Sequence, residues 1–413
     1  MNDPSKGNLK IHITSESSGF PVADARVRIS YTGVPDSVLE EVTTDSSGQT
    51  DTLALDAPPE EYSLEETAEE QPYAEYTILA EAPGMEPVSI AGAEILSGVT
   101  AIQNIRMRPA GPDTEGEERF VIPAHTLYGN YPPKIPEDEI KPVSETGEIV
   151  LSRVVVPEYI VVHDGSPRDS TARNYYVKYK DYIKNVASSE IYATWPENTI
   201  RANVLAIMSF TLNRVYTEWY RNQGYDFTIT SSTAFDHKWI PERNIYDTIS
   251  SVVDELFADY LSRPNVRQPI LTQYCDGRQV QCAGWMTQWG SKSLGDQGYS
   301  AIRILRYYYG DDLYINTAEA ISGIPSSWPG YDLEEGSTGD KVRQLQEQLT
   351  AIAGAYPALP KLTADGIYGP ATADAVRRFQ GVFGLPRTGV TDYPTWYKIS
   401  EIYVGVSRIA ELT

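Results

Sequence analysis

Glu190 is the residue best placed to do acid–base chemistry. It follows a helix-compatible run, 182–189, that contains no second acid, and a strongly apolar helix comes after it. Apolar residues recur in that helix at the spacing of one helical face, as at Ile200, Val204 and Ile207. Such a helix is buried on most sides, so an acid at its entrance is held rigidly and could donate a proton. The alternative is a solvated helix-end carboxylate, the commoner situation for a lone acid.

The residues just after Glu190 contain signals for a helix start. Thr194 and Glu197 have the spacing of a capping box, in which each side chain bonds to the other residue's backbone N–H. Pro196 falls near the first turn, where its missing N–H costs nothing. We therefore expect Glu197 to cap the helix rather than to take part in catalysis.

Two separated blocks resemble the core of the stage II sporulation protein D family, the amidase-enhancer and lytic-transglycosylase fold. The second block, GWMTQWGSKSLGDQGYSAIRILRYYYG at 284–310, is similar to the family's Gly-Met-Ser-Gln-Trp-Gly motif and its Tyr-Tyr ending. The resemblance spans roughly residues 155–317 and implies a mixed α/β (α+β) domain there. In the first block, the residues in register with the family pattern are Tyr182, Ile183, Val186, Glu190, Ile191, Trp195, Pro196, Ile200, Ala202, Asn203 and Val204.

The resemblance implies a peptidoglycan lytic transglycosylase in which Glu190 is the catalytic acid and base. Glu190 would protonate the glycosidic oxygen between N-acetylmuramic acid and N-acetylglucosamine. It would then take the proton of the muramic acid C6 hydroxyl, which leaves a 1,6-anhydro product. The substrate-binding residues that the same motifs imply are Ser188, Ser189, Tyr274, Asp276, Gln288 and Trp289.

Departures from the family pattern leave other functions open. Asn203 and Met208 stand where the family usually has Gln and Arg, and the segment between Gly277 and Gly284 is short. A second hypothesis is a non-catalytic glycan-binding scaffold that stimulates a partner amidase of the cell wall. A third, a structural adhesin, explains neither helical block. A groove open to Glu190 would favour the enzyme, and an occluded Glu190 would favour the scaffold.

The chain has two cysteines, Cys275 and Cys282, around the turn signal at Asp276 and Gly277. They are near enough in sequence to form a disulfide, and two reduced thiols are an equally good interpretation. Zinc is a third possibility, because some relatives of the sporulation family carry a Cys/His site. Only His237 lies near, and two cysteines with one histidine match no usual zinc pattern. We expect no metal and no cofactor.

Composition divides the chain into three domains and two linkers. Residues 1–109 contain short alternating runs separated by turns, which predicts an all-β sandwich. Within them, GFPVADARV followed by TTDSSG resembles the carboxypeptidase regulatory-like sandwiches. A Pro/Glu-rich linker or arm follows at 110–150, then the central domain at 151–317 and a Gly/Pro-containing linker at 318–331.

The last domain, 332–413, resembles the peptidoglycan-binding domain 1 family along almost its whole length. The matching motifs are DGIYG at 365–369, FQ at 379–380 and TGVT at 388–391. Pro370 is expected to open a helix, and Phe379 to lie in the core of a small all-α, three-helix unit. Tyr368 and Arg377 are the residues we expect to be exposed and to contact peptidoglycan.

Charge and hydropathy restrict the partners. The formal charge is −23, and residues 1–120 hold 23 Asp and Glu against 7 Lys and Arg. This disfavours nucleic acid and anionic membranes, and apolar runs such as 204–212 are too short for a membrane span. The start, MNDPSKGNLKIHIT, lacks the apolar stretch of a secretory signal. We expect a role in sporulation or wall remodelling, with peptidoglycan as partner. The protein would be wall- or spore-associated and reach the wall from a mother-cell cytoplasm or by non-classical release.

Overall fold

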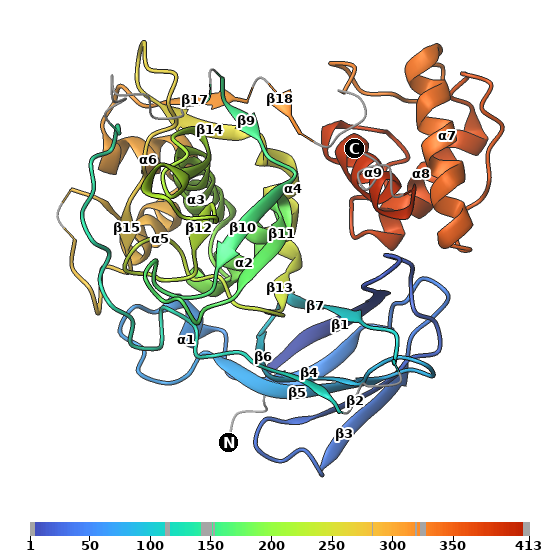
Figure 1. Ribbon diagram of the computed structural model, residues 1–413, viewed down its shortest axis with the longest axis horizontal. Coiled ribbons are helices and arrows are strands. Elements are labelled where there is room, and N and C mark those ends of the chain that lie inside the picture. The colour runs from blue at the N-terminus through green and yellow to red at the C-terminus, as the bar shows by residue number, and fades with distance from the viewer. Residues whose placement is uncertain are drawn as a thin grey trace.

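The computed structural model describes residues 5–111, 116–141, 151, 153–282, 284–318, 320–322 and 328–407. Figure 1 shows three bodies: a β-sheet body at the bottom, a mixed body at the upper left and a helical body at the right. The prediction of a β-rich beginning and a helical end is confirmed.

The N-terminal body consists of two sheets that pack against each other. In β1 the side chains of Leu9, Ile11 and Ile13 are buried and alternate with more exposed ones, because one face of the strand looks into the space between the sheets. A short helix, α1 (Glu61–Leu64), precedes β5. The five-stranded sheet has the order β3 (Val38–Thr43), β2 (Arg26–Tyr31), β5 (Tyr73–Glu81), β6 (Val88–Leu96), β8 (Glu118–Val121). The four-stranded sheet has the order β13 (Ile245–Tyr246), β7 (Thr100–Met107), β1 (Ser5–Ser15), β4 (Leu53–Ala57).

Two strands of this sandwich come from outside residues 1–109. Strand β8 lies in the segment predicted as a linker and runs parallel to β6. Strand β13 belongs to the central part of the chain and pairs with β7, so that Ile245 lies opposite Ile102. The predicted boundary at residue 109 therefore does not coincide with the edge of either sheet.

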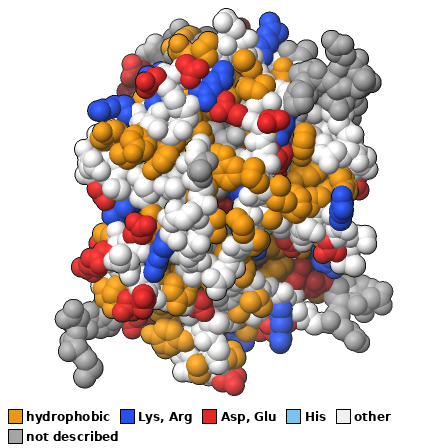
Figure 2. Space-filling model, turned by 90° about the vertical axis from the view of Figure 1, so that its left-hand side faces the viewer, with side chains coloured by type: hydrophobic (Ala, Val, Ile, Leu, Met, Phe, Trp, Pro, Cys, Tyr) orange, Lys and Arg blue, Asp and Glu red, His pale blue; other side chains and the backbone are white. Residues whose placement is uncertain are grey.

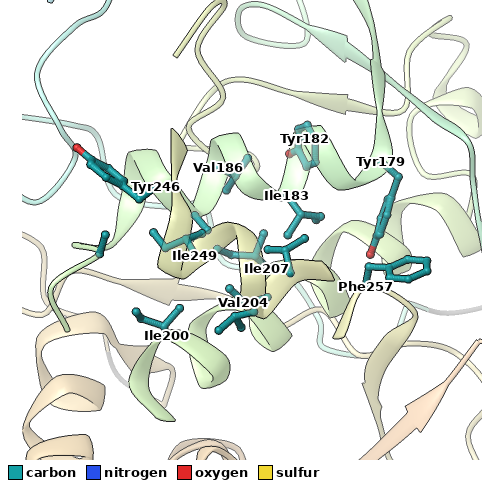
Figure 3. Packing of buried hydrophobic residues seen from close by; sticks show 14 of the residues in the cluster. Tyr179, Tyr182, Ile183, Val186, Ile200, Val204, Ile207, Tyr246, Ile249 and Phe257 are labelled. Carbon is teal, nitrogen blue, oxygen red and sulfur yellow. The ribbon is translucent and has the colours of Figure 1, made fainter. Parts of the chain in front are cut away.

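The mixed body is built around α3 (Glu197–Tyr216), which is buried along most of its length. Buried residues occur on most of its sides, as expected for a helix enclosed by other elements. Figure 3 shows Ile183 of α2, Ile207 of α3 and Ile249 of α4 meeting in the core of this body. The helices that pack on α3 are α2 (Tyr179–Glu190), α4 (Asp247–Leu256), α5 (Gln288–Asp296) and α6 (Ala301–Tyr309).

Short strands and one 3₁₀ turn, η1 (Arg221–Gln223), complete the mixed body. A three-stranded sheet has the order β11 (Asn174–Lys178), β10 (Tyr159–His163), β12 (Ile229–Thr230). The two-stranded pairs are β14 (Asp259–Ser262) with β17 (Tyr314–Thr317), β15 (Tyr274–Cys275) with β16 (Met286–Thr287), and β18 (Ala320–Ile321) with β9 (Val155–Val156).

The predicted capping box at the start of α3 is wrong. The helix begins at Glu197, and Pro196 is its N-cap. The Thr194 hydroxyl lies 2.8 Å from the hydroxyl of Ser63 in the sandwich, and exposed Glu197 pairs instead with Arg201 at 2.8 Å. Thr194 is therefore used for a contact between domains, which local spacing does not reveal.

The C-terminal body has three helices, and two glutamines in it make equivalent hydrogen bonds to nearby turns. Gln346 Oε1 accepts the N–H of Gly366, and Gln380 Oε1 accepts the N–H of Gly389, both at 2.9 Å. Each glutamine Nε2 donates to the carbonyl of the residue after that glycine, at 3.0 and 2.9 Å. The helices are α7 (Asp340–Ala355), α8 (Pro370–Val382), which Pro370 opens as predicted, and α9 (Tyr393–Ser407).

Polar contacts join the three bodies. Arg243 of the mixed body and Glu94 of the sandwich form a 2.6 Å ion pair with side chains 0% and 1% exposed. Lys180 of α2 reaches Glu401 of α9 at 2.9 Å. On the face seen in Figure 2, acidic and basic side chains are interspersed with apolar ones. No helix in the described part of the chain combines the length and apolar character that a membrane crossing needs.

Candidate active site

Glu190 is the last residue of α2 and is only 3% exposed. Ten of the twelve residues of α2 are buried, including the last four, so packing around the whole helix end fixes its position. Ile191 leaves the helical conformation, and Trp195, which donates to the carbonyl of Ser63 at 2.9 Å, fixes the short connection to α3. The acid is thus a rigid, buried group rather than a solvated helix-end carboxylate.

Three other elements hold Glu190. The hydroxyl of Tyr274 in β15 donates to Oε2, and the backbone N–H of Lys238 donates to Oε1 at 2.6 Å. Gln288, the first residue of α5, donates from Nε2 to the main-chain oxygen of Glu190 at 2.9 Å. Both carboxylate oxygens therefore have a donor, and the orientation of the acid is set before any ligand arrives.

Burial raises the pKa of the Glu190 carboxyl above its ordinary value. The Lys134 ammonium and the two hydrogen bonds from Lys238 and Tyr274 favour the charged form and offset part of that rise. A carboxyl with a raised pKa can keep its proton closer to neutral pH, which is what a general acid needs.

A segment of the predicted linker covers this acid. We call residues 124–141 the strap. With Glu190, Tyr274 and Gln288, residues 131–134 of the strap line a cavity of about 60 Å³. The ammonium of Lys134 lies 4.8 Å from the centre of the Tyr274 ring and donates to the main-chain oxygen of Asp236. Ligand sites usually have several hundred Å³, so Glu190 is occluded in this conformation.

Several predicted site residues meet at this cavity. Tyr274, Asp276 and Gln288 line it together with Glu190. The Asp276 carboxylate is already used within its own loop, because it accepts the backbone N–H groups of residues 278, 279 and 280 at 3.2, 2.5 and 2.8 Å. Cys275 and Cys282 form a disulfide with their Cα atoms 6.2 Å apart, which closes that loop beside the cavity.

Three predicted substrate-binding residues lie elsewhere. Trp289 is 4% exposed and packs on Trp195, with ring centres 5.0 Å apart, so it is a core residue and not a sugar platform. Ser188 and Ser189 are fully buried and do not line the cavity. Ser189 donates to the carbonyl of Asn185 at 2.9 Å, as a helix hydroxyl commonly does. These assignments are corrected: Ser188 and Ser189 adjoin Glu190 in sequence and Trp289 adjoins Gln288, but helix packing turns all three side chains into the core.

In the C-terminal body, Tyr368 is 1% exposed, contrary to the predicted exposure. Its hydroxyl donates to the carbonyl of Gly389 at 2.8 Å, which keeps the ring inside the domain. Arg377 is exposed, as expected. Of the two predicted peptidoglycan contacts, only Arg377 has a side chain that a polymer could touch.

Sequence reasoning missed Lys134 and Lys238. Neither belongs to a sequence motif. Lys134 reaches the cavity because the Pro-rich strap lies over it, and Lys238 contributes its backbone N–H, which any residue except proline could supply. The run YPPK at 131–134 was the available signal, since a stiff Pro-rich stretch can lie over a neighbouring domain. Within the described ranges, no group of three or more His, Cys, Asp and Glu side chains could hold a metal ion.

Residues 338–399 match the family described as "Putative peptidoglycan binding domain". The zinc D-Ala-D-Ala carboxypeptidase of Streptomyces albus G is 41% identical over 76 residues, 18% of this chain and 28% of the relative. The N-acetylmuramoyl-L-alanine amidase CwlA of Bacillus subtilis (strain 168) is 49% identical over 49 residues, 11% of this chain and 18% of the relative. The chain thus spans less than a third of either relative, and it carries a peptidoglycan-binding domain at its C-terminal end.

Among solved structures, the Bacillus anthracis TIE protein matches with a TM-score of 0.19 and 17% identity. The match covers 26% of this chain and 18% of that one. A similarity of this size carries no argument about the fold or the function.

Proposed function

We propose that this protein binds peptidoglycan through its C-terminal domain and cleaves glycan strands in its central domain, as a lytic transglycosylase. The observation that supports the proposal best is the state of Glu190. It is a buried acid with a raised pKa, it is oriented by Tyr274 and Lys238, and it lies on a chain with a peptidoglycan-binding domain.

The chemistry needs one group that first gives and then takes a proton. Glu190 would donate its proton to the oxygen of the bond between N-acetylmuramic acid and N-acetylglucosamine as that bond breaks. The resulting carboxylate would accept the proton of the C6 hydroxyl, whose oxygen closes onto C1 of the same sugar. The product ends in 1,6-anhydro-muramic acid, and no second carboxylate is required.

Tyr274 and Lys238 have a defined part in this scheme. Their donors hold the carboxylate in one orientation in both protonation states, so neither proton transfer waits for a side-chain rotation. The membership of residues 155–317 in the stage II sporulation protein D family belongs to the same proposal. So does the likeness of the N-terminal sandwich to carboxypeptidase regulatory-like domains.

The second candidate is a non-catalytic scaffold that stimulates a wall amidase. It is favoured by one observation, the small cavity of about 60 Å³ at Glu190, which has no room for a sugar. The two candidates predict different products, because a scaffold leaves the glycan strands uncut.

Product analysis separates them. The full chain is incubated with purified peptidoglycan, and the released sugars are identified by mass spectrometry. The enzyme proposal expects soluble muropeptides with 1,6-anhydro ends. Polymer that binds the protein but releases no anhydro ends over a range of peptidoglycans contradicts it and leaves the scaffold.

A further inference from the structure

We infer that the strap is a built-in gate on the Glu190 site. Its middle part, residues 129–134, occupies the space that a glycan strand needs beside Glu190, and the strand enters when this part lifts. The inference rests on the proposed function, since it concerns access to the same site.

The strap closes the site sterically. Tyr131, Pro132, Pro133 and Lys134 form one wall of the 60 Å³ cavity, and Glu190 lies within it. A disaccharide needs a space of the order of hundreds of Å³. Glu190 cannot therefore reach a glycosidic oxygen while the strap is in place.

Both ends of the strap are firmly attached. At one end, Thr126 donates twice to the carbonyl of Ser189, from its N–H at 3.2 Å and its hydroxyl at 3.0 Å. At the other end, Glu137 forms a two-point ion pair with Arg214 at 2.6 and 2.9 Å. Bidentate pairs of this kind are among the strongest charge-assisted contacts, so the ends act as fixed points.

The middle of the strap is held more weakly. The carbonyl of Pro132 accepts a long hydrogen bond, 3.4 Å, from Thr233, and Tyr131 donates to Ala124 within the strap itself. Pro132 and Pro133 are exposed and have no N–H to contribute. Lys134 makes the main closing contacts: its ammonium donates to the main-chain oxygens of Asp236 and Thr233 and lies over the Tyr274 and Phe210 rings. Most contacts of the middle thus come from one side chain, Lys134, so the middle can open locally when that side chain is released, without unfolding of the domain.

A larger cavity lies on the far end of the strap. Residues 135–138 form one of its walls, Trp219 and Tyr225 lie on another, and its volume is about 980 Å³. This volume is in the range of ligand sites, and aromatic side chains offer flat apolar surfaces to sugar rings. Lifting the middle of the strap would open Glu190 next to a space that can hold several sugars.

The test changes the strap without touching the acid. Pro132→Gly/Pro133→Gly raises the conformational entropy of the open strap and so lowers the free energy of opening. It leaves Glu190, Tyr274 and Lys134 unchanged. We expect the rate of anhydro-muropeptide release from peptidoglycan to rise about 5- to 30-fold. The matched control is Pro357→Gly, at an exposed proline of the C-terminal body, which should leave the rate unchanged.

A second readout does not depend on catalysis. The Lys238 N–H donates to the buried carboxylate of Glu190, so its hydrogen exchange reports on opening of the site. Exchange should be faster in Pro132→Gly/Pro133→Gly than in the wild type, and soluble glycan fragments should accelerate it further.

The outcomes separate the gate from the proposed function. Equal release rates together with unchanged exchange at Lys238 overturn the gate, even if the wild type cuts. If no variant releases anhydro ends, the lytic function fails and the exchange data alone decide the gate. Faster exchange in the glycine variant and on addition of fragments then supports it, and unchanged exchange overturns it.

Discussion

Arg243 and Glu94 form an ion pair of 2.6 Å that is closed to solvent and links the mixed body to the sandwich. Arg243 also donates to the carbonyl of Ser188, two residues before the candidate acid, at 2.7 Å. The neighbouring Asn244 donates to the Glu94 main-chain oxygen at 2.9 Å. The helix end that carries Glu190 is therefore tied directly to the N-terminal sandwich, which makes the sandwich part of the support of the site.

The first prediction concerns this pair. Arg243→Met leaves the Glu94 charge buried without a partner, and the free energy of unfolding should fall by about 3–5 kcal/mol. Denaturant titration of both proteins measures it. The control is Arg119→Met, which removes the exposed pair with Glu117 at 3.1 Å and should cost at most about 1 kcal/mol. Equal losses for the two variants would show that the buried pair contributes no more to the free energy of unfolding than the exposed pair does.

The second prediction concerns Glu190. Glu190→Gln keeps the size of the side chain but cannot exchange the catalytic proton, so release of anhydro-muropeptides should fall by a factor of about 10² to 10⁴. Binding to insoluble peptidoglycan should stay the same, because the C-terminal domain is unchanged. Exposed Glu197→Gln is the control and should keep its activity. A wild-type rate in Glu190→Gln would move the search to another acid, with Asp226, Asp236 and Asp276 as the candidates.

The third prediction concerns pH. Burial raises the pKa of Glu242 to about 7, and Arg106 offsets only part of this effect. Because the folded state holds this proton above the ordinary Glu pKa of 4.5, the contribution to stability is fully present below about 4.5. It is lost as the pH rises through 7. Denaturant midpoints between pH 5 and 8 should therefore fall less steeply in Glu242→Gln than in the wild type. A slope in Glu242→Gln equal to that of the wild type would contradict this prediction.

The fourth prediction concerns the C-terminal body. Phe379 is fully buried in α8, and Phe379→Ala should lower the free energy of unfolding of this domain by about 3–5 kcal/mol. Loss of peptidoglycan binding should then follow the loss of folding, as circular dichroism and pull-down on residues 332–413 would measure. Arg378→Ala removes an exposed pair with Asp374 and should affect neither. Full binding by a destabilised Phe379→Ala domain would separate the two properties.

The sequence carried enough information for the local features of the fold. Alternating apolar residues such as Leu9, Ile11 and Ile13 predicted strands, and Pro370 predicted the start of α8. The position of Glu190 between a helix-compatible run and a second, apolar helix was also predicted, and it lies at the end of α2 just before α3. These features depend on residues that are close in sequence, so a pattern can indicate them.

Features that depend on distant partners could not be predicted. Lys134 lies in a Pro-rich stretch without periodicity, and only the folded chain brings it to Glu190. Tyr368 looks like a surface residue of a turn, but a carbonyl at Gly389 satisfies its hydroxyl inside the domain. Thr194 has the spacing of a cap, and Ser63 takes its hydroxyl instead.

Because β8 and β13 lie outside residues 1–109, the sandwich should behave differently when residues 1–109 are produced alone. Strand β13 covers the margin of β7, and strand β8 covers the margin of β6. A fragment that stops at residue 109 loses both, and two rows of backbone N–H and C=O groups become open templates for pairing with other chains. The isolated sandwich should therefore tend to associate edge to edge. In the full protein, β8 and β13 cover these two edges and so oppose aggregation.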